Sequence, residues 1–335
     1  MIDYADIIVD LQAGDTGKGK IANHLMSKSK KYTHVVRYNG GGNAGHTFYY
    51  EGKKIITHYI PIGVIYKIKS IIGPGCVVNP TKLFEEINDL ETIGFPVRDY
   101  LKIDKRVHIV QDEYVEEDMS DSQIGTTKTG NGPTYRNKYN RTGLRAENCD
   151  ELKDFIVDTY DEFHGKNKVK ILFEGAQGFE LDIDWGDYPF VTSSHCTAGS
   201  ALMNGVPPQK VREVYGVAKA YRTYVGAKSF EPNNPIFEEI REKFGEFGAT
   251  TGRPRQINWL DLDTLIKATN INGATIVIFN KFDVLKSINT FELIYKGENK
   301  KFDNEAEFVF FIKKKINKFC PTVNKIVFSE SPYSI

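Results

Sequence analysis

Short β-branched runs alternate with amphipathic helical stretches along the chain, and this alternation constrains the fold more than any other feature. Strands that alternate with helices are typical of an α/β fold, in which helices cover both faces of a largely parallel sheet. We therefore predict one P-loop-like α/β domain over residues 1–335. The strand candidates cover residues 5–11, 34–38, 70–78, 169–176, 213–221, 273–282 and 324–330, and the helical candidates include 81–94, 151–165 and 306–319.

Three segments break this pattern. Residues 121–145, 186–200 and 226–258 are rich in Gly, Thr, Asn and Arg. Loops of this length inside a compact domain are usually functional or disordered. Their composition suits the capture of phosphate or carboxylate groups, so we expect long functional loops here.

The charge balance restricts the class of partner. Lys and Arg together number 44, as do Asp and Glu, so no net field attracts nucleic acid or an anionic membrane. The longest apolar runs, such as residues 276–279, fall well short of the roughly 18 residues of a membrane span. Four widely separated cysteines include no C-x-x-C pair and are typical of reduced thiols. We expect a cytoplasmic protein with small-molecule partners, or one of the host cytoplasm if a phage encodes it.

A glycine-rich loop follows the first strand candidate. Residues 14–20 satisfy G-x-x-x-x-G-K, whose backbone N–H groups cradle phosphate oxygens, but Ile21 stands where a Mg²⁺-binding Ser or Thr is usual. Asp15, inside the loop, is either a helix N-cap or the residue that takes over the metal or base role. The strand before the loop and the helix after it favour nucleotide binding. The predicted phosphate-binding residues are Gly14, Thr16, Gly17, Lys18, Gly19 and Lys20.

A second nucleotide signal lies near the C-terminus. The strand candidate at residues 275–279 runs directly into Asn280-Lys281-Phe282-Asp283, an N-K-x-D sequence. A carboxylate at Asp283 can accept from both guanine N1–H and the 2-amino group, and adenine offers no such pair of donors. Alone this sequence is weak because Asn and Asp also favour turns. Together with the phosphate loop it indicates GTP.

The third signal is a run of three glycines at residues 40–42, followed by Asn43 and His46. Backbone without side chains can approach a ligand closely. A single histidine is more often structural than catalytic, but the adjacent glycines favour catalysis for His46.

At this point the chain resembles a known family. The stretches QAGDTGKGK, GGGNAGHT, IGTT, GNGPTYRNKYNRTGLR, FEGAQG, LDIDWGDYPFVTSS, EFGATTGR, WLD and NKFD follow the order found in adenylosuccinate synthetases, from about residue 7 to residue 332. The short chain is most similar to the archaeal and phage branch, which includes the phage 2-aminoadenylosuccinate synthetases.

The resemblance implies a ligase that joins L-aspartate to C6 of IMP with GTP, by way of a 6-phosphoryl intermediate. Oxygen O6 is a poor nucleophile until N1 loses its proton, so a carboxylate must act as base. Asp15 matches that family base, which also ligates Mg²⁺, and Gly45 is the second implied metal ligand. His46 matches the residue that assists phosphoryl transfer.

The same resemblance implies the remaining binding residues and a homodimer. Arg141 matches an arginine that reaches the purine 5′-phosphate from the neighbouring subunit. The implied purine monophosphate site is Asn43, Thr127, Arg141, Gln177, Thr192 and Arg253. The implied aspartate site is Thr250, Thr251, Arg253 and Arg255, and the implied guanine site is Lys281, Asp283, Ser329 and Ser331.

The chain departs from the family pattern at several positions. The family usually has Trp and Glu in the phosphate loop and an uninterrupted run of arginines in the aspartate loop. It also has an arginine in the segment that corresponds to residues 221–233, and a glycine near the guanine. The departing residues are Ala13, Thr16, Tyr224, Pro254, Gln256 and Ser331.

Two alternatives to an IMP ligase stay open. A phage branch of the family converts dGMP, typically lacks the loop aspartate and often lacks K-x-D, whereas this chain keeps Asp15 and Asp283. Asp15 therefore favours IMP without excluding dGMP or GMP. A GTP-binding regulatory module is the other alternative, but such a module has no use for the Gly/Thr/Arg loop at residues 248–255.

Overall fold

A computed structural model gives the structure of the chain and describes residues 1–28, 31–120, 124–248, 252–331 and 335. Its largest sheet has nine strands, and every neighbouring pair in it is parallel. In spatial order they are β17 (Lys325–Phe328), β14 (Ile276–Asn280), β11 (Val211–Lys219), β1 (Ile2–Asp10), β10 (Val169–Glu174), β2 (His34–Arg37), β5 (Lys69–Ile72), β7 (Leu101–Asp104) and β9 (Ile156–Val157).

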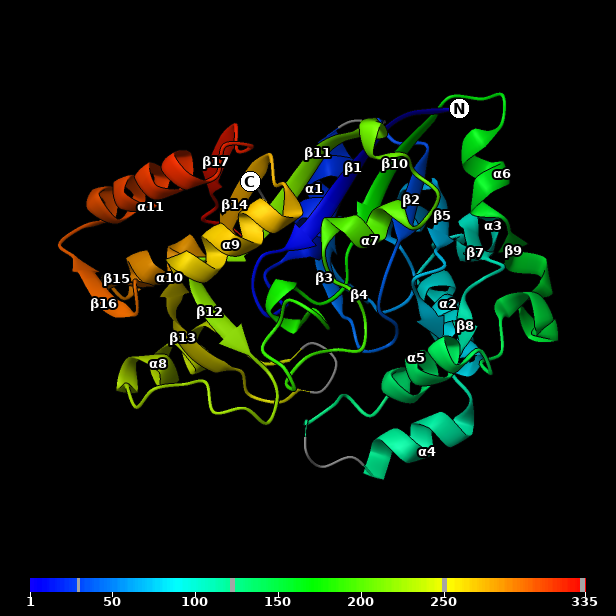
Figure 1. The fold of residues 1–335 in the computed structure, drawn as a ribbon, viewed down its shortest axis with the longest axis horizontal. Coiled ribbons are helices and arrows are strands. Elements are labelled where there is room, and N and C mark those ends of the chain that lie inside the picture. The colour runs from blue at the N-terminus through cyan, green and yellow to red at the C-terminus, as the bar shows by residue number, and fades with distance from the viewer. Residues whose placement is uncertain (29–30, 121–123, 249–251, 332–334) are drawn as a thin grey trace.

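Smaller sheets and helices surround this sheet (Figure 1). A four-stranded sheet holds β12 (Tyr221–Tyr224), β13 (Gln256–Asp261), β15 (Phe291–Tyr295) and β16 (Glu298–Phe302). Two strand pairs are β3 (His46–Tyr50) with β4 (Lys53–Thr57) and β6 (Val77–Val78) with β8 (His108–Ile109). The described α-helices are α1 (Lys18–Lys28), α2 (Pro80–Thr92), α3 (Val97–Tyr100), α4 (Asp112–Ser120), α5 (Asn131–Asn140), α6 (Thr159–His164), α7 (Ala198–Leu202), α8 (Pro235–Phe244), α9 (Leu262–Asn272), α10 (Phe282–Ser287) and α11 (Glu305–Phe319).

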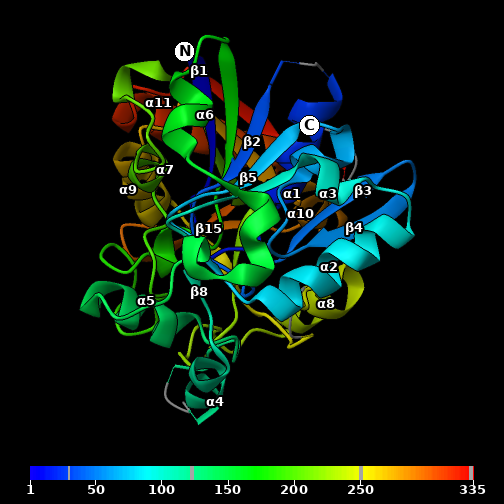
Figure 2. The ribbon, with the colours of Figure 1, turned by 90° about the vertical axis from the view of Figure 1, so that its right-hand side faces the viewer.

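The central strands are apolar on both faces because each face packs against a separate core. In β1, Ile7 and Val9 belong to one core while Ile8 belongs to the other. Side chains alternate along a strand, so a continuous apolar run fills both cores at once. Figure 2 shows α7 and α9 on one side of the sheet and α1 and α2 on the other. This arrangement confirms the predicted α/β fold with a largely parallel central sheet.

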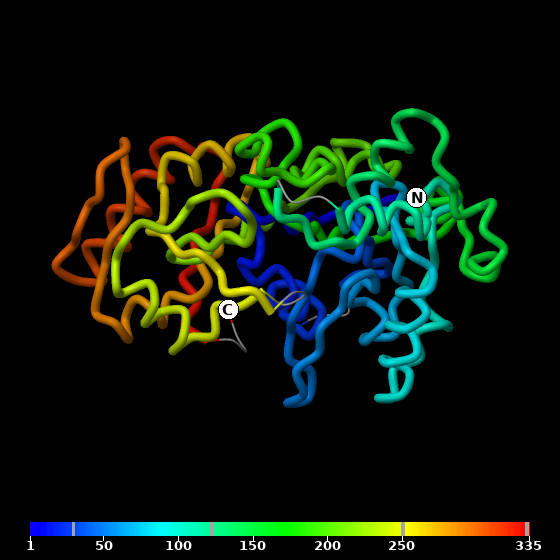
Figure 3. The backbone as a smooth tube through the Cα atoms, turned by 90° about the horizontal axis from the view of Figure 1, so that it is seen from below, coloured from blue at the N-terminus to red at the C-terminus, as the bar shows by residue number. Residues whose placement is uncertain are grey.

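The two halves of the chain extend from this sheet in different directions. Seen from below in Figure 3, the orange and red C-terminal segments lie at one end of the long axis and the cyan segments at the other. None of the helices that the structure describes has the length and apolar character that a membrane crossing requires.

Some predicted element boundaries were wrong. Residues 151–165 do not form one helix, because Ile156 and Val157 pair with β7 and Asp158 then caps α6 through the Tyr160 N–H. The segments expected as loops also contain regular structure. Residues 121–145 include α5, and residues 226–258 include α8, which Asn234 caps through the Ile236 N–H. The Asn234 cap favours the start of α8 at this position, whereas Gly130, before α5, makes no side-chain cap.

Candidate functional site

The carboxyl ends of the central strands open onto one cavity of about 1040 Å³. Ligands of open parallel sheets bind at this edge, because the loops that leave the strands converge there. Nearly all the predicted site residues line this cavity, namely Gly14, Asp15, Thr16, Gly17, Lys18, Gly19, Lys20, Asn43, Gly45, His46, Thr127, Gln177, Thr192, Arg253, Arg255, Lys281, Asp283 and Ser331. Arg141 and Ser329 are not among its lining residues, and Thr250 and Thr251 lie outside the described residues.

The phosphate loop is held in shape by Asp10, the last residue of β1. The Asp10 carboxylate accepts from the Thr16 hydroxyl and backbone N–H, and from the Lys18 ammonium at 2.9 Å. Lys18 also donates to the Gln177 carbonyl at 2.5 Å. Lys18 is therefore tied inside the loop in this structure. Sequence reasoning missed Asp10, although its place at the strand end just before the glycines was a usable signal.

Lys20 is the loop cation with neutral partners. Its ammonium donates to the Asn280 side-chain oxygen at 2.9 Å and to the Ser329 hydroxyl at 2.6 Å. Burial lowers the pKa of Lys20 to about 8, although the nearby Asp283 carboxylate opposes this shift. Asn280 also donates to the Thr16 carbonyl at 2.8 Å. The phosphate loop and the ends of β14 and β17 thus meet around one ammonium group.

The tight contact between Asn280 and the loop explains one glycine. Gly17 has a φ of +98°, and a Cβ there would lie 2.7 Å from the Asn280 amide nitrogen. A side chain at residue 17 would therefore separate the phosphate loop from the N-K-x-D segment. In that segment Lys281 donates to the Phe244 carbonyl at 3.2 Å, and Asp283 lies in the first turn of α10 beside the cavity.

His46 lies between two buried ionisable groups. Its Nε2 is 2.9 Å from Arg37 Nη1, and its Nδ1 is 3.6 Å from the Glu174 carboxylate. Because a guanidinium only donates, we assign Nε2 as the acceptor and place the ring proton on Nδ1. Burial and the Arg37 charge hold the pKa of His46 well below its ordinary value. The ring is therefore neutral, and both its nitrogens face buried groups in this structure.

The start of α5 lines another part of the cavity with polar groups that suit an anion. Asn131 is 6% exposed, and its side-chain amide has no hydrogen-bond partner among the described residues. Thr127 and Thr129 share a hydrogen bond of 3.1 Å close by in the chain, and Thr192 lines the same cavity. Unpaired N–H groups at a helix N-terminus favour an anion. Arg141, which directly follows α5, is exposed.

The Gly/Thr/Arg loop at residues 248–255, which we call the carboxylate loop, is closed at its base by backbone pairing. Gly248 N–H donates to the Arg253 carbonyl at 2.8 Å, and Arg255 N–H donates to the Glu246 carbonyl at 2.9 Å. Arg253 donates to the Gly125 carbonyl at 3.2 Å, which links this loop to the segment before α5. The residues at the tip, including Thr250 and Thr251, lie outside the described part of the chain.

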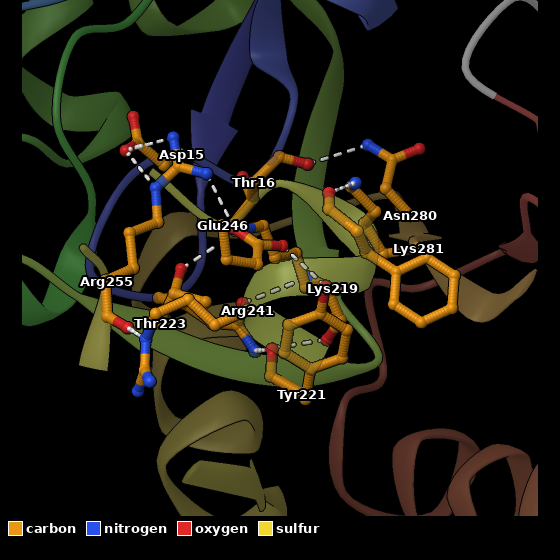
Figure 4. Close-up of polar contacts among 12 residues, drawn as sticks. Asp15, Thr16, Lys219, Tyr221, Thr223, Arg241, Glu246, Arg255, Asn280 and Lys281 are labelled. Atoms are coloured by element: carbon orange, nitrogen blue, oxygen red, sulfur yellow. Dashed lines mark hydrogen bonds and ion pairs between the residues drawn. The ribbon is translucent and has the colours of Figure 1, made fainter. Parts of the chain in front are cut away.

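Figure 4 shows the Arg255 guanidinium between two carboxylates, those of Asp15 and Glu246. Glu246 also accepts from the Lys219 ammonium at 2.8 Å and from the Tyr221 hydroxyl. Burial opposes ionisation of Glu246, but the Lys219 and Arg255 charges hold its pKa well below the ordinary value. Sequence reasoning missed Lys219 and Glu246 as a pair. Lys219 ends a central strand, which could have marked it, but its partner is 27 residues away.

Oxygen donors suitable for a magnesium ion are present in the cavity. The Asp15 carboxylate and the Gly45 carbonyl both belong to residues that line it. Hard oxygen ligands of this kind are those that Mg²⁺ prefers. One Asp15 oxygen, Oδ2, is taken by Arg255 in this structure, so the donor set fits a metal once that carboxylate is free to turn.

Three comparisons place the chain among known proteins. The adenylosuccinate synthetase family profile matches residues 7–155 and 146–323. The adenylosuccinate synthetase of Caldanaerobacter subterraneus is 39% identical over 86% of this chain and 79% of its own length. That of a Geobacillus strain is 38% identical over 87% of this chain and 81% of its own length.

Solved structures agree with the sequence matches. The fully ligated adenylosuccinate synthetase of Plasmodium falciparum superposes with a TM-score of 0.83 at 30% identity, covering 98% of both chains. The cyanophage S-2L succinoaminodeoxyadenylate synthetase gives a TM-score of 0.76 at 21% identity, covering 99% of this chain and 94% of its own, and so shares the fold. The chain therefore belongs to the adenylosuccinate synthetase family of ligases.

Proposed function

We propose that this protein joins L-aspartate to C6 of IMP, with GTP hydrolysed to GDP and phosphate through a 6-phosphoryl intermediate. The observation that carries this proposal is the convergence of four kinds of group on one cavity. These are the phosphate loop, the N-K-x-D segment, the Asp15 carboxylate and the arginines of the carboxylate loop. A GTP-binding regulatory module would not need the last of these, and family membership argues against it.

Asp15 is the base of the proposed reaction. A carboxylate held against N1 of the purine removes its proton, and O6 then attacks the γ-phosphorus of GTP. The aspartate amine next displaces phosphate from C6. His46 assists the phosphoryl transfer, which requires its ring to turn away from Arg37 and Glu174 when ligands bind.

Asp15 and Gly45 would hold the magnesium ion. The ion would neutralise charge on the transferring phosphoryl group. Lys20 would contact the GTP phosphates, since its present partners are neutral and exchangeable. Asp283 and Lys281 would select guanine over adenine.

The purine monophosphate would bind at the start of α5, near Asn43, Thr127 and Thr192. The unpartnered Asn131 amide supports this position, because a buried amide without partners is costly unless a ligand satisfies it. Gln177 and Arg253 would complete the nucleotide site.

A second candidate substrate is dGMP or GMP. The cyanophage neighbour is described as bound to dGMP and to dATP as an energy donor. In this chain Ala13 leaves a small side chain at the cavity wall beside Asp15, which would give a purine 2-amino group space. The retained Asp15 and Asp283 favour IMP as acceptor and GTP as donor.

One assay separates these substrates. Phosphate release is measured with L-aspartate and every combination of IMP, GMP or dGMP with GTP, ATP or dATP. We expect IMP with GTP to give the highest kcat/KM. Higher activity with dGMP would favour the second candidate, and no aspartate-dependent release with any pair would overturn the ligase proposal.

We also propose a homodimer in which Arg141 completes the partner's monophosphate site. Its exposure at the far end of α5 from the cavity supports a role outside its own subunit. An Arg141→Leu subunit and an Asp15→Asn subunit should each be nearly inactive alone. Mixed with subunit exchange, they should recover about a quarter of the wild-type activity, because half of the dimers are mixed and each has one intact site. Exchange without recovery would contradict the shared site.

A further inference from the structure

One side of the Arg255 guanidinium is held by the buried pair Glu246 and Lys219. Its Nη1 donates to Glu246 at 2.6 Å, and Glu246 is itself held by Lys219. Glu246 is 0% exposed and Lys219 is 2% exposed, so water does not compete for these bonds. The Arg255 carbonyl accepts from Arg241 Nε at 2.9 Å. Backbone and side chain are therefore both anchored, and the direction of the guanidinium is set.

The opposite edge of the same guanidinium holds the phosphate-loop carboxylate. Nε and Nη2 both approach Asp15 Oδ2, at 2.8 and 2.7 Å. An edge with two parallel N–H donors is the arrangement by which arginine recognises a free carboxylate. Asp15 therefore occupies the edge of Arg255 that a carboxylate ligand in this cavity would use.

The charges of the cluster of Lys219, Glu246 and Arg255 balance only while one carboxylate is bound at the Nε/Nη2 edge of Arg255. Lys219 and Arg255 supply two positive charges, and Glu246 and Asp15 supply two negative charges. If Asp15 turned away, the cluster would carry a net positive charge beside the cavity. If a substrate carboxylate joined while Asp15 stayed, the net charge would become negative. Unbalanced buried charge is costly, so the two carboxylates should exchange rather than share the site.

We propose that Asp15 occupies the position of a substrate carboxylate on the Nε/Nη2 edge of Arg255, and that L-aspartate binds by displacing Asp15. The buried Lys219–Glu246 pair orients this edge of the guanidinium. This inference rests on the proposed function, which assigns Asp15 as the base and Arg255 to the aspartate. It adds a coupling between two sites, because the arriving dicarboxylate displaces Asp15 from Arg255 and thereby favours its turn toward the purine. Glu246 and Lys219 are positioning residues that act through Arg255.

The first test removes the competing carboxylate. Binding of L-aspartate is measured by calorimetry in the presence of the purine monophosphate that supports turnover and without GTP or magnesium, so that no reaction occurs. Asp15→Asn should bind L-aspartate about five-fold more tightly than wild type, the factor expected for loss of a partly exposed ion pair. The same substitution that stops turnover should thus improve binding.

A matched control separates exchange from general electrostatics. Glu117 also lines the cavity, but its carboxylate pairs with Arg136. Glu117→Gln removes the same charge without freeing Arg255 and should leave aspartate affinity within about two-fold of wild type. Unchanged or weaker binding by Asp15→Asn, or equal tightening by Glu117→Gln, would overturn the exchange.

The second test removes the anchor. Glu246→Gln should raise the KM for L-aspartate about ten-fold while the KM for GTP stays within about two-fold, since only the Arg255 edge loses its support. Glu180→Gln is the matched control, because Glu180 is another buried glutamate paired with an arginine, Arg222, and does not line the cavity. A general loss of structure would raise both KM values. Equal effects on both substrates, or on both variants, would overturn the positioning role.

Different results would overturn the carboxylate exchange and the proposed ligase function. If Glu246→Gln does not fold, the Asp15→Asn binding measurement decides the exchange by itself. If no purine monophosphate supports aspartate-dependent phosphate release by the wild-type protein, the proposed function fails. If release occurs but Asp15→Asn binds aspartate no more tightly, only the exchange fails.

Discussion

Two buried clusters adjoin the cavity, and each places a glutamate beside an arginine. In the first, Glu246 accepts hydrogen bonds from Lys219, Arg255 and Tyr221. In the second, Glu174 Oε2 has no hydrogen-bond partner in the described part of the chain. Arg37 Nε and Nη2 are also unpartnered there, as is His46 Nδ1. The first cluster is complete without a ligand, and the second is not.

The contrast shows in the pKa values of two equally inaccessible carboxyl groups. Burial raises the pKa of Glu174, and the Arg37 charge only partly opposes this shift. Burial acts on Glu246 as well, but Lys219 and Arg255 outweigh it and the pKa falls well below the ordinary value. Burial alone therefore does not decide the charge of a buried glutamate, whereas the number of its cationic partners does. We infer that the complete cluster supports the site and that the incomplete one rearranges around ligands.

The largest expected effect comes from breaking the complete cluster. Glu246→Gln should lower the free energy of unfolding by about 3 kcal/mol, because it leaves Lys219 and Arg255 buried with one anion fewer. Denaturant titration at neutral pH measures this. If Glu246→Gln lowers the free energy of unfolding less than Glu174→Gln does under the same conditions, the Glu246 cluster is not the more stabilising of the two.

Removing the Asp15 charge, at the cavity end of the same cluster, should lower turnover strongly but change the free energy of unfolding little. Asp15→Asn keeps the shape of the side chain but removes the proton acceptor, so kcat should fall by at least about 10²-fold. The Asp15 side chain is 32% exposed, and its loss should change the free energy of unfolding by about 1 kcal/mol or less. Steady-state kinetics and denaturant titration on one preparation check both values. Turnover close to that of the wild type would remove Asp15 from the mechanism.

The sequence predicts the fold and the loops that form the cavity better than the buried cluster behind them. Apolar runs and the glycine loop are local patterns, so β1, the phosphate loop and α1 could be predicted from neighbouring residues. Lys219 and Glu246 lie 27 residues apart, and Asp15 and Arg255 lie 240 apart. No spacing rule relates such pairs, since tertiary packing alone brings them together. Thr250 and Thr251 stay predictions.

The two lysines of the phosphate loop, Lys18 and Lys20, also differ in whether the protein itself supplies a charged partner. Lys18 is paired with the Asp10 carboxylate, whereas Lys20 has only neutral hydrogen-bond partners in the described structure and a pKa of about 8. In the proposed GTP site the phosphates would bind the charged ammonium of Lys20, and that form is lost as pH rises through 8. Affinity for a non-hydrolysable GTP analogue should therefore weaken about ten-fold between pH 7 and pH 9.

Lys20→Arg is the control for this pH dependence. A guanidinium stays protonated over the whole range, so the affinity of this variant should be nearly constant with pH. Equal pH dependence in both proteins would assign the titration to another group.

The smallest effect, and the sharpest test of the comparison, is expected at Glu174. Glu174→Gln keeps an acceptor for the Ile62 N–H, which now donates to Oε1 at 3.1 Å. Because the folded-state pKa of Glu174 is raised, its ionised form is disfavoured in the fold. The wild-type protein therefore loses stability as pH rises from the unfolded-state pKa of the carboxyl group, near 4.3, through its raised folded-state pKa.

The Glu174→Gln variant has no such loss. Its free energy of unfolding relative to wild type should improve with pH and stay within about 1 kcal/mol at pH 5. Denaturant titrations of the wild-type protein and Glu174→Gln at pH 5, 6.5 and 8 give the result. If the Glu174→Gln difference moves the other way with pH, Glu174 is a fully paired anion and the two clusters are alike.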